Sequence, residues 1–150
     1  MISRESLARN WFFEGLERAQ IDALLAIGQE VSYPAGGEVV VEGEPAESFH
    51  ILVQGVVSIK MRAEEHGELV LSTLQQPGEI FGWSVFVEEG RSTATAECLE
   101  ETRILSFKKE DLEDFFAKNP SLGYFFMKRL ASLISRRLES TRALLVKQIS

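Results

Sequence analysis

One stretch of the chain, residues 77–96 (PGEIFGWSVFVEEGRSTATA), combines the residue types that bind anions. Gly78 permits a tight turn, Gly82 permits close backbone approach, and the WSVF segment is long enough for one helical turn, whose first amides carry partial positive charge. Arg91 adds a charge-assisted fork of donors for a phosphate. Two residues with hydroxyl or amide donors follow it, Ser92 and Thr93. The stretch indicates an anion site, and the competing interpretation is a solvated arginine in a surface loop.

The other reactive residue types form no recognisable catalytic or metal site. His50 and His66 are isolated, and His50 alternates with apolar neighbours in SFHILVQ as a strand residue does. Cys98 is the single cysteine, so it forms no internal disulfide, and we expect it to be a buried strand residue. No serine stands in a nucleophile elbow. We therefore expect a protein that is not an enzyme and holds no metal.

Length and charge exclude several classes of protein. With 150 residues, 45% of them hydrophobic, the chain can build one globular core without metals or disulfides. A net charge of −7 argues against a free-standing nucleic-acid binder, which needs a basic face. The first residues lack the apolar core of a signal peptide, and no run reaches the roughly 18 apolar residues of a membrane helix. We expect a cytoplasmic protein that does not contact membranes.

The elements that must position the anion site fall into three consecutive segments of one domain, mainly β with flanking helices. Residues 1–28 carry two short amphipathic helical patterns, the second stopped by Gly28. Residues 29–107 alternate β-rich runs with turn signals, which indicates a small antiparallel barrel or jelly roll. Residues 108–150 are helical again, and the first helix there ends before Pro120. The β-rich runs are EVSY, EVVVE, SFHILVQ, VVSIKMR, LVLSTL, ATAECL and TRILSF.

The segment after Pro120 has the spacing of a coiled-coil seam. Its heptad positions, about three repeats long, are Met127, Ala131, Ile134, Leu138, Thr141, Leu145 and Gln148. A helix of roughly 28 residues is on the order of 40 Å long, more than a small barrel covers. We therefore expect a parallel homodimer, and the competing interpretation is a helix packed along its own barrel. The residues expected to form the dimer contact are Ile134, Leu138, Thr141 and Leu145.

Four motifs in this order resemble the cyclic nucleotide-binding domain of the CRP/FNR-like regulators, the catabolite activator protein type. YPAGGEVVVEGEPAESFHILVQGVVSI has Gly43 and Gly55 at the barrel-turn positions. PGEIFGWSVF matches the start of the phosphate-binding cassette, RSTATA matches the arginine followed by small residues, and RRLESTR lies on the long helix. The resemblance spans nearly the whole chain. It implies an antiparallel β-roll with a long C-terminal dimerisation helix.

The resemblance also implies a ligand, a cyclic nucleotide such as cAMP or cGMP, and no other cofactor. In that family the cassette arginine and the cassette-helix amides hold the phosphate, and Arg91 and Ser92 fall on those positions. Thr141 falls where a threonine reaches the purine across the dimer interface, and the counterpart of Arg137 lies near the cassette. Guanine preference is linked to a threonine near the arginine, but Thr93 alone does not choose the base. The expected ligand-binding residues are Phe81, Gly82, Trp83, Ser84, Val85, Arg91, Ser92, Thr93, Arg137 and Thr141.

Trp83 departs from the family pattern. Members that bind cyclic nucleotides carry a glutamate directly after the cassette FG, where it accepts a hydrogen bond from the ribose 2′-hydroxyl, whereas an indole only donates. Losing that acceptor costs roughly 1.5–3 kcal/mol, a ten- to hundredfold loss of affinity. Trp83 then stacks on the ligand, fills the ribose site or anchors the cassette in the core. Ser84 beside it is placed to replace part of the lost contact.

Several functions remain open. The first is a nucleotide sensor that acts through a partner protein; the second is the sensor fragment of a longer CRP/FNR-like transcription regulator. The sequence reaches Ser150 and contains no DNA-binding domain, so we expect no DNA binding by this chain alone. The third is an interaction or scaffold module that has lost its ligand, the alternative that Trp83 favours. The fourth is another anion or haem in the same roll.

Overall fold

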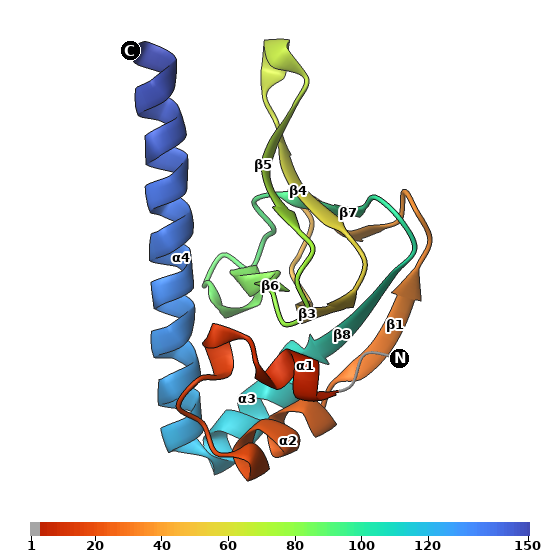
Figure 1. Ribbon diagram of the computed structural model, residues 1–150, viewed down its shortest axis with the longest axis vertical. Helices are drawn as coiled ribbons and strands as arrows, with labels where there is room; N and C mark the ends of the chain where they lie inside the picture. The colour runs from red at the N-terminus through yellow and green to blue at the C-terminus, as the bar shows by residue number, and fades with distance from the viewer. Residues whose placement is uncertain (1–3) are drawn as a thin grey trace. The chain divides into compact units, whose positions relative to one another are not determined.

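The computed structural model describes residues 4–150, which form two compact units (Figure 1). The first unit runs to Glu113 and contains the strands, and the second unit, Asp114–Ser150, is helical. The helical elements before the strands are α1 Arg4–Ala8, the 3₁₀ turn η1 Trp11–Phe13 and α2 Arg18–Ala26. The strands are β1 Gln29–Tyr33, β2 Glu38–Val40, β3 Ser48–Gln54, β4 Val57–Arg62, β5 Glu68–Leu74, β6 Ile80–Phe81, β7 Thr95–Cys98 and β8 Thr102–Lys108. The remaining elements are the 3₁₀ turns η2 Glu64–His66 and η3 Trp83–Phe86 and the helices α3 Lys109–Lys118 and α4 Pro120–Ile149.

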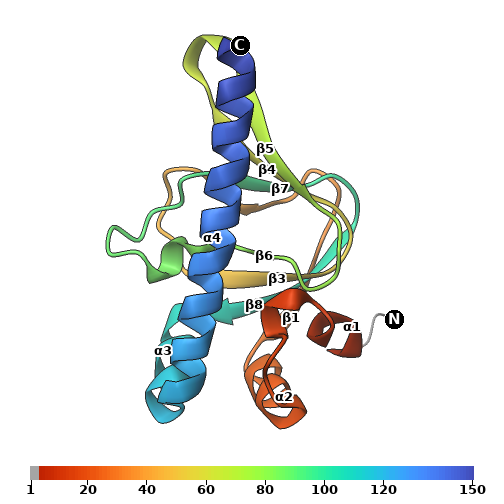
Figure 2. The ribbon, with the colours of Figure 1, turned by 60° about the vertical axis from the view of Figure 1, so that its left-hand side comes forward.

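The strands form two antiparallel four-stranded sheets, with the orders β1-β8-β3-β6 and β2-β7-β4-β5. Apart from β4 and β5, which form a hairpin, neighbours in each sheet are not consecutive in the chain, as in a rolled-up sheet. Figure 2 shows β3, β6 and β8 lying one above another, and in Figure 1 the β4–β5 hairpin extends from the roll as a ribbon. The predicted β-roll with flanking helices is therefore confirmed. The sequence does not predict β6, because two apolar residues carry no alternating pattern.

Strand β3 is buried along both faces, which explains its uninterrupted apolar sequence. Successive strand residues point to opposite faces. Phe49 packs near Phe107, with ring centroids 6.2 Å apart, whereas Leu52 belongs to the core of the roll. Since it alternates with Phe49, His50 faces the same side as Leu52, into the roll. The buried members of the roll core are Leu52, Val57, Leu74, Phe81, Ala96, Cys98 and Ile104.

Two predictions on single residues are tested by this core. Cys98 is a fully buried strand residue, as predicted, and burial raises the pKa of its thiol. Helix α2 ends at Ala26 with Ile27 as its C-cap, directly before Gly28 as predicted, although Gly28 does not have a left-handed φ angle. A Cβ at Gly28 would lie 2.8 Å from side-chain atoms of both Leu105 and Phe107. The glycine is therefore required by close packing on β8.

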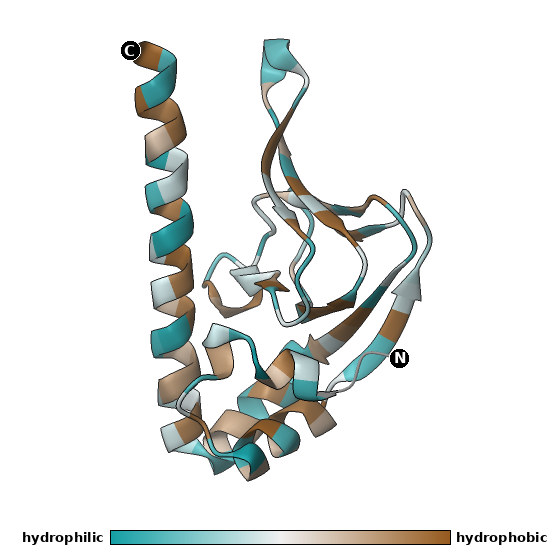
Figure 3. Ribbon diagram, viewed as in Figure 1, coloured by the Kyte–Doolittle hydropathy of each residue, from teal (hydrophilic) through white to brown (hydrophobic). Residues whose placement is uncertain are grey.

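The second unit is built around α4, which begins at Pro120 and confirms the predicted long C-terminal helix. Phe116 and Phe126 pack with ring centroids 5.0 Å apart, and a Cβ at Gly123 would lie 3.0 Å from the Cβ of Phe116. Bands of hydrophobic and hydrophilic residues alternate along α4 in Figure 3. No helix in residues 4–150 combines the length and apolar composition needed to cross a membrane.

Candidate ligand-binding site

The cassette segment, residues 77–93, contains two glycines that its geometry requires. Gly78 and Gly82 have φ angles of 93° and 82°, which favour glycine. A Cβ at Gly78 would lie 2.5 Å from the Cβ of Asn10, and one at Gly82 would lie 2.9 Å from His50 Cδ2. Gly82 immediately precedes η3, so the helical turn predicted at WSVF is present as a short 3₁₀ turn.

The end of the cassette segment pairs with the loop at residues 43–46 through the backbone. The Gly43 N–H donates to the Ser92 carbonyl at 2.7 Å, and the Ser92 N–H donates to the Glu44 carbonyl at 2.9 Å. Gly43 has a φ angle of 87°, as its predicted place at a turn requires. The Ser92 amide is therefore already used by the backbone, and the polar group that this residue has left is its hydroxyl.

Arg91 is held by the same loop and remains exposed to solvent. Its Nη1 donates to the Gly43 carbonyl at 2.9 Å. A carbonyl carries no net charge, and no carboxylate among the described residues forms an ion pair with Arg91. A guanidinium has five N–H donors, so this contact orients the group while most donors stay available for an anion.

The other predicted residues of the cassette segment lie in different environments. Phe81 and Val85 are almost fully buried, with 2% and 1% of their surface exposed, so their side chains are not accessible to a ligand. Ser84 is also buried, Trp83 is half-buried and Thr93 is exposed. Trp83 occupies the first position of η3, and its indole offers only a hydrogen-bond donor.

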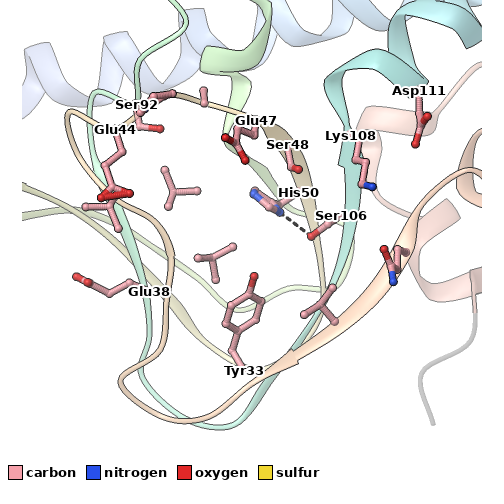
Figure 4. Close-up of a pocket in the computed structure, with 18 of the residues that line it drawn as sticks. Tyr33, Glu38, Glu44, Glu47, Ser48, His50, Ser92, Ser106, Lys108 and Asp111 are labelled. Atoms are coloured by element: carbon pink, nitrogen blue, oxygen red, sulfur yellow. Dashed lines mark hydrogen bonds between the residues drawn. The ribbon is translucent and has the colours of Figure 1, made fainter.

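A cavity of about 550 Å³ opens in the roll next to the cassette segment (Figure 4). Of the predicted site residues, it is lined by Gly82 and Ser92, whereas Arg91 does not line it. Its apolar walls include valines of β1 and β2, and its polar lining includes Tyr33 and His50. The charged residues of its lining are Glu38, Glu44, Glu47, Asp111 and Lys108.

His50 is a residue of this cavity that the sequence interpretation placed only on a strand face. Its Nδ1 lies 2.8 Å from the Ser106 hydroxyl, and its ring stacks on Phe81 with centroids 5.1 Å apart. Burial lowers the pKa of His50 to about 4, so the imidazole is neutral at neutral pH. In the sequence, the alternation of Phe49, His50 and Ile51 indicates only that His50 lies on one face of a strand. Its place in the cavity depends on Ser106, which is 56 residues away in the chain.

Arg137 and Thr141 lie on α4, in the second unit. The Thr141 hydroxyl donates to the Arg137 carbonyl at 2.9 Å, one turn earlier on the same helix. Thr141 is exposed and Arg137 is half-buried. A role for these two residues toward a ligand stays a prediction.

Comparisons with known proteins identify the family of this fold. A family model described as "Cyclic nucleotide-binding domain" matches residues 30–119. The chain belongs to this family. The match takes in all of β2 to β8, the cassette segment and α3, so the cyclic nucleotide-binding domain comprises the elements that build the cavity and hold Arg91.

Three relatives of this cyclic nucleotide-binding domain are similar over most of the chain. A CRP-like cAMP-activated global transcriptional regulator of Mycobacterium tuberculosis is 33% identical over 137 residues, 91% of this chain and 59% of the relative. The Thermus thermophilus catabolite activator protein has a TM-score of 0.78 at 27% identity, covering 91% of this chain and 62% of that one. The N-terminal domain of a Streptomyces coelicolor transcriptional regulator has a TM-score of 0.73 at 26% identity, with coverages of 93% and 94%. The chain thus spans about 59% of the length of its M. tuberculosis relative.

Proposed function

We propose that this domain is a non-catalytic sensor that binds a cyclic nucleotide and holds its phosphate at Arg91. The observation that carries the proposal is the state of Arg91, an exposed guanidinium oriented by the Gly43 carbonyl and not neutralised by a carboxylate of the described chain. A preorganised cation of this kind forms strong, charge-assisted hydrogen bonds with a phosphate. Membership of the cyclic nucleotide-binding family supplies the class of ligand.

Other groups of the cassette segment are proposed to contact the same nucleotide. Ser92, which carries a hydroxyl, follows Arg91 in the sequence, and the amides of η3 follow the left-handed Gly82. Phe81 and Val85 contribute backbone groups only, because their apolar side chains are buried, whereas Ser84 also carries a hydroxyl and is as buried as Ser92. Trp83 then contacts the sugar or the base through its ring, since its indole does not accept a hydrogen bond.

Adenine is the first base to test. The relatives from M. tuberculosis and T. thermophilus are named for cAMP, and those names are the ground for preferring it. Thr93 follows Arg91 and is exposed. Because the family resemblance links a threonine near the arginine to guanine preference, guanine is the second base to test. Both nucleotides carry the same cyclic phosphate, so the proposed role of Arg91 is common to them.

We also propose a homodimer through α4. Leu138 and Leu145, at heptad positions, expose 48% and 62% of their surfaces, and Ile134 exposes 36%. Such a stripe on a helix is stabilised when it packs against a second helix of the same kind. In the dimer, Thr141 is the proposed contact with the base and Arg137 the proposed contact near the phosphate-binding segment. The chain's net charge of −7 supports action through a protein partner rather than direct DNA binding.

Trp83 favours a second function, an interaction module that has lost nucleotide binding. A half-buried indole replaces the ribose-binding carboxylate of the family pattern. The missing acceptor weakens binding about ten- to hundredfold. In this alternative the exposed stripe on α4 is the functional surface and the cassette segment is structural.

The test is calorimetric titration of the chain with cAMP and cGMP, in parallel with Arg91→Ala and Arg62→Ala. Arg62 is an exposed arginine at the end of β4, so it controls for the loss of one positive charge. The proposal predicts binding in the micromolar range, about −8 kcal/mol, for the wild type and Arg62→Ala. Arg91→Ala is expected to bind about ten- to hundredfold more weakly. Absence of heat with both nucleotides, with an unchanged melting temperature at millimolar ligand, would contradict the sensor and favour the interaction module.

A further inference from the structure

The cavity beside the cassette segment has a wall that phosphate recognition by Arg91 does not use. Tyr33 on β1 and His50 on β3 both direct polar groups into it, as Figure 4 shows. A volume of about 550 Å³ is within the range of small-molecule sites. The residues that line the cavity indicate which class of ligand it binds.

His50 is fixed on three sides and open on the fourth. Ser106 contacts Nδ1 at 2.8 Å, Phe81 stacks on the ring, and Gly82 closes the Cδ2 edge. Only 5% of the residue is exposed. Within the described residues Nε2 has no hydrogen-bond partner, and this atom is not sealed in the core. A buried imidazole is therefore held with one nitrogen available to a molecule in the cavity.

The remaining lining separates into an apolar wall and an acidic rim. Val31, Val39 and Val40 supply the apolar wall. Four carboxylates and one ammonium, that of Lys108, belong to the lining. In the part of the chain that the structure describes, none of these carboxylates forms an ion pair. The carboxylates are those of Glu38, Glu44, Glu47 and Asp111.

We propose that this cavity is a second binding site, for a small organic amine with an apolar body and a hydroxyl group. The hydroxyl bonds to Nε2 of His50, which serves as donor or acceptor according to its tautomer. The apolar body packs on the valines, and the ammonium lies at the acidic rim near Glu44 and Glu47. These two glutamates lie in or directly after the loop at residues 43–46, whose backbone hydrogen-bonds to Gly90 and Ser92 of the cassette segment. An anion is disfavoured there, because the carboxylates outnumber the one lysine.

The site differs in charge from the one at Arg91, so the two select different ligands. Arg91 does not line the cavity and presents a free positive charge to solvent. The cavity presents negative charge at its rim and a neutral imidazole inside. Gly82 and Ser92 border both, which places the amine next to the cassette segment without using its cation.

The probes are tyramine, its carboxylate counterpart 3-(4-hydroxyphenyl)propionate, and phenethylamine, which lacks the hydroxyl. The chain has two histidines, so the ring signals of His50 are resolved by NMR, and those of His66 on η2 serve as an internal reference. Tyramine is expected to move the His50 signals saturably and to leave those of His66 in place. The propionate is expected to bind at least about tenfold more weakly, and phenethylamine about three- to tenfold more weakly.

Variants assign these differences to residues. The double variant Glu44→Gln and Glu47→Gln is expected to reduce the preference for tyramine over the propionate by at least about threefold. The matched control, Glu64→Gln with Glu65→Gln on η2, is expected to keep it. In His50→Phe, followed by calorimetry, tyramine and phenethylamine are expected to bind equally. Tyramine is titrated into the chain without nucleotide, so failure of the nucleotide proposal does not affect this test.

The proposal is overturned if millimolar tyramine leaves the His50 signals in place while the protein is folded. It is also overturned if the propionate binds as tightly as tyramine, because the acidic rim then selects nothing. Equal loss of tyramine binding in the two pairs of glutamate variants would assign the attraction to the net charge of the chain, and would likewise contradict a built site.

Discussion

Arg91 and His50 are two basic side chains of one compact unit with opposite electrostatic environments. Arg91 is exposed, and its guanidinium is held by a neutral carbonyl, so its full charge is directed outward. His50 is buried between Phe81 and Gly82, and desolvation keeps it neutral. The difference shows how the roll separates two tasks, because a charge useful for an anion stays in contact with water and a buried ring is left with hydrogen bonding.

The largest effect expected from this comparison is on stability in acid. Burial lowers the pKa of His50 to about 4 from 6.5, so between these values the unfolded chain binds more protons than the folded one. The free energy of unfolding therefore falls as the pH falls through this range, by about 3 kcal/mol in total. Urea unfolding at several pH values measures the loss. His50→Gln is expected to lack this component, and His66→Gln is expected to retain it; equal acid sensitivity of all three proteins would show that His50 is not buried as described.

The next largest effect is expected on nucleotide affinity when Trp83 is replaced. Trp83→Glu introduces an acceptor for the ribose 2′-hydroxyl, and we expect affinity for cAMP to rise about ten- to hundredfold, or roughly 1.5–3 kcal/mol. Calorimetric titration of Trp83→Glu and of the control Trp83→Phe separates a gained hydrogen bond from a change in packing, and their melting temperatures verify folding. A gain in Trp83→Phe of the same size would assign the wild-type weakness to steric blocking.

Gly82 links the two regions, and its replacement is expected to disturb both. In Gly82→Ala, the left-handed backbone is strained and the new Cβ lies 2.9 Å from His50 Cδ2, so the free energy of unfolding is expected to fall by about 2 kcal/mol. The matched control is Gly36→Ala, with a φ angle of 86° and no atom within 4 Å of the added Cβ. Chemical denaturation is expected to show the smaller loss in the control. Equal losses of unfolding free energy in Gly82→Ala and Gly36→Ala would mean that the contact between the new Cβ and His50 does not destabilise the fold.

The smallest effect isolates the support of the imidazole. Ser106→Ala removes the partner of His50 Nδ1 and is expected to lower the free energy of unfolding by about 1 kcal/mol. Nucleotide affinity is expected to stay unchanged, because Ser106 does not contact Arg91. A variant that binds nucleotide differently would show that the two regions are coupled through β3 and β8.

Much of the fold was predictable from the sequence because its signals are local. The run SFHILVQ coincides with β3, and WSVF forms the expected turn after Gly82. The two-residue strand β6 was not predictable, since it exists only through pairing with His50 and Ile51. The packing role of Gly28 was not predictable either, because the atoms that exclude a Cβ belong to β8.

The candidate site divides in the same way. Arg91 and Ser92 followed from residue types and from a family resemblance, and the structure adds that the Ser92 amide is already bonded to Glu44. The cavity around His50 could not be predicted from the sequence, because its walls come from four strands, β1, β2, β3 and β8, that meet only in the folded chain. No local pattern in SFHILVQ reveals that Ser106 lies opposite the imidazole.

The central claim, that Arg91 holds the phosphate of a cyclic nucleotide, is tested most directly at the guanidinium itself. The measurement is the ¹⁵N–¹H spectrum of the arginine Nε groups during titration with cAMP, with the Arg91 signal assigned by its absence in Arg91→Ala. We expect the Arg91 signal to shift saturably with added nucleotide, while the Arg62 signal stays in place. Saturating heat of binding with an unmoved Arg91 signal would place the nucleotide elsewhere and contradict the claim.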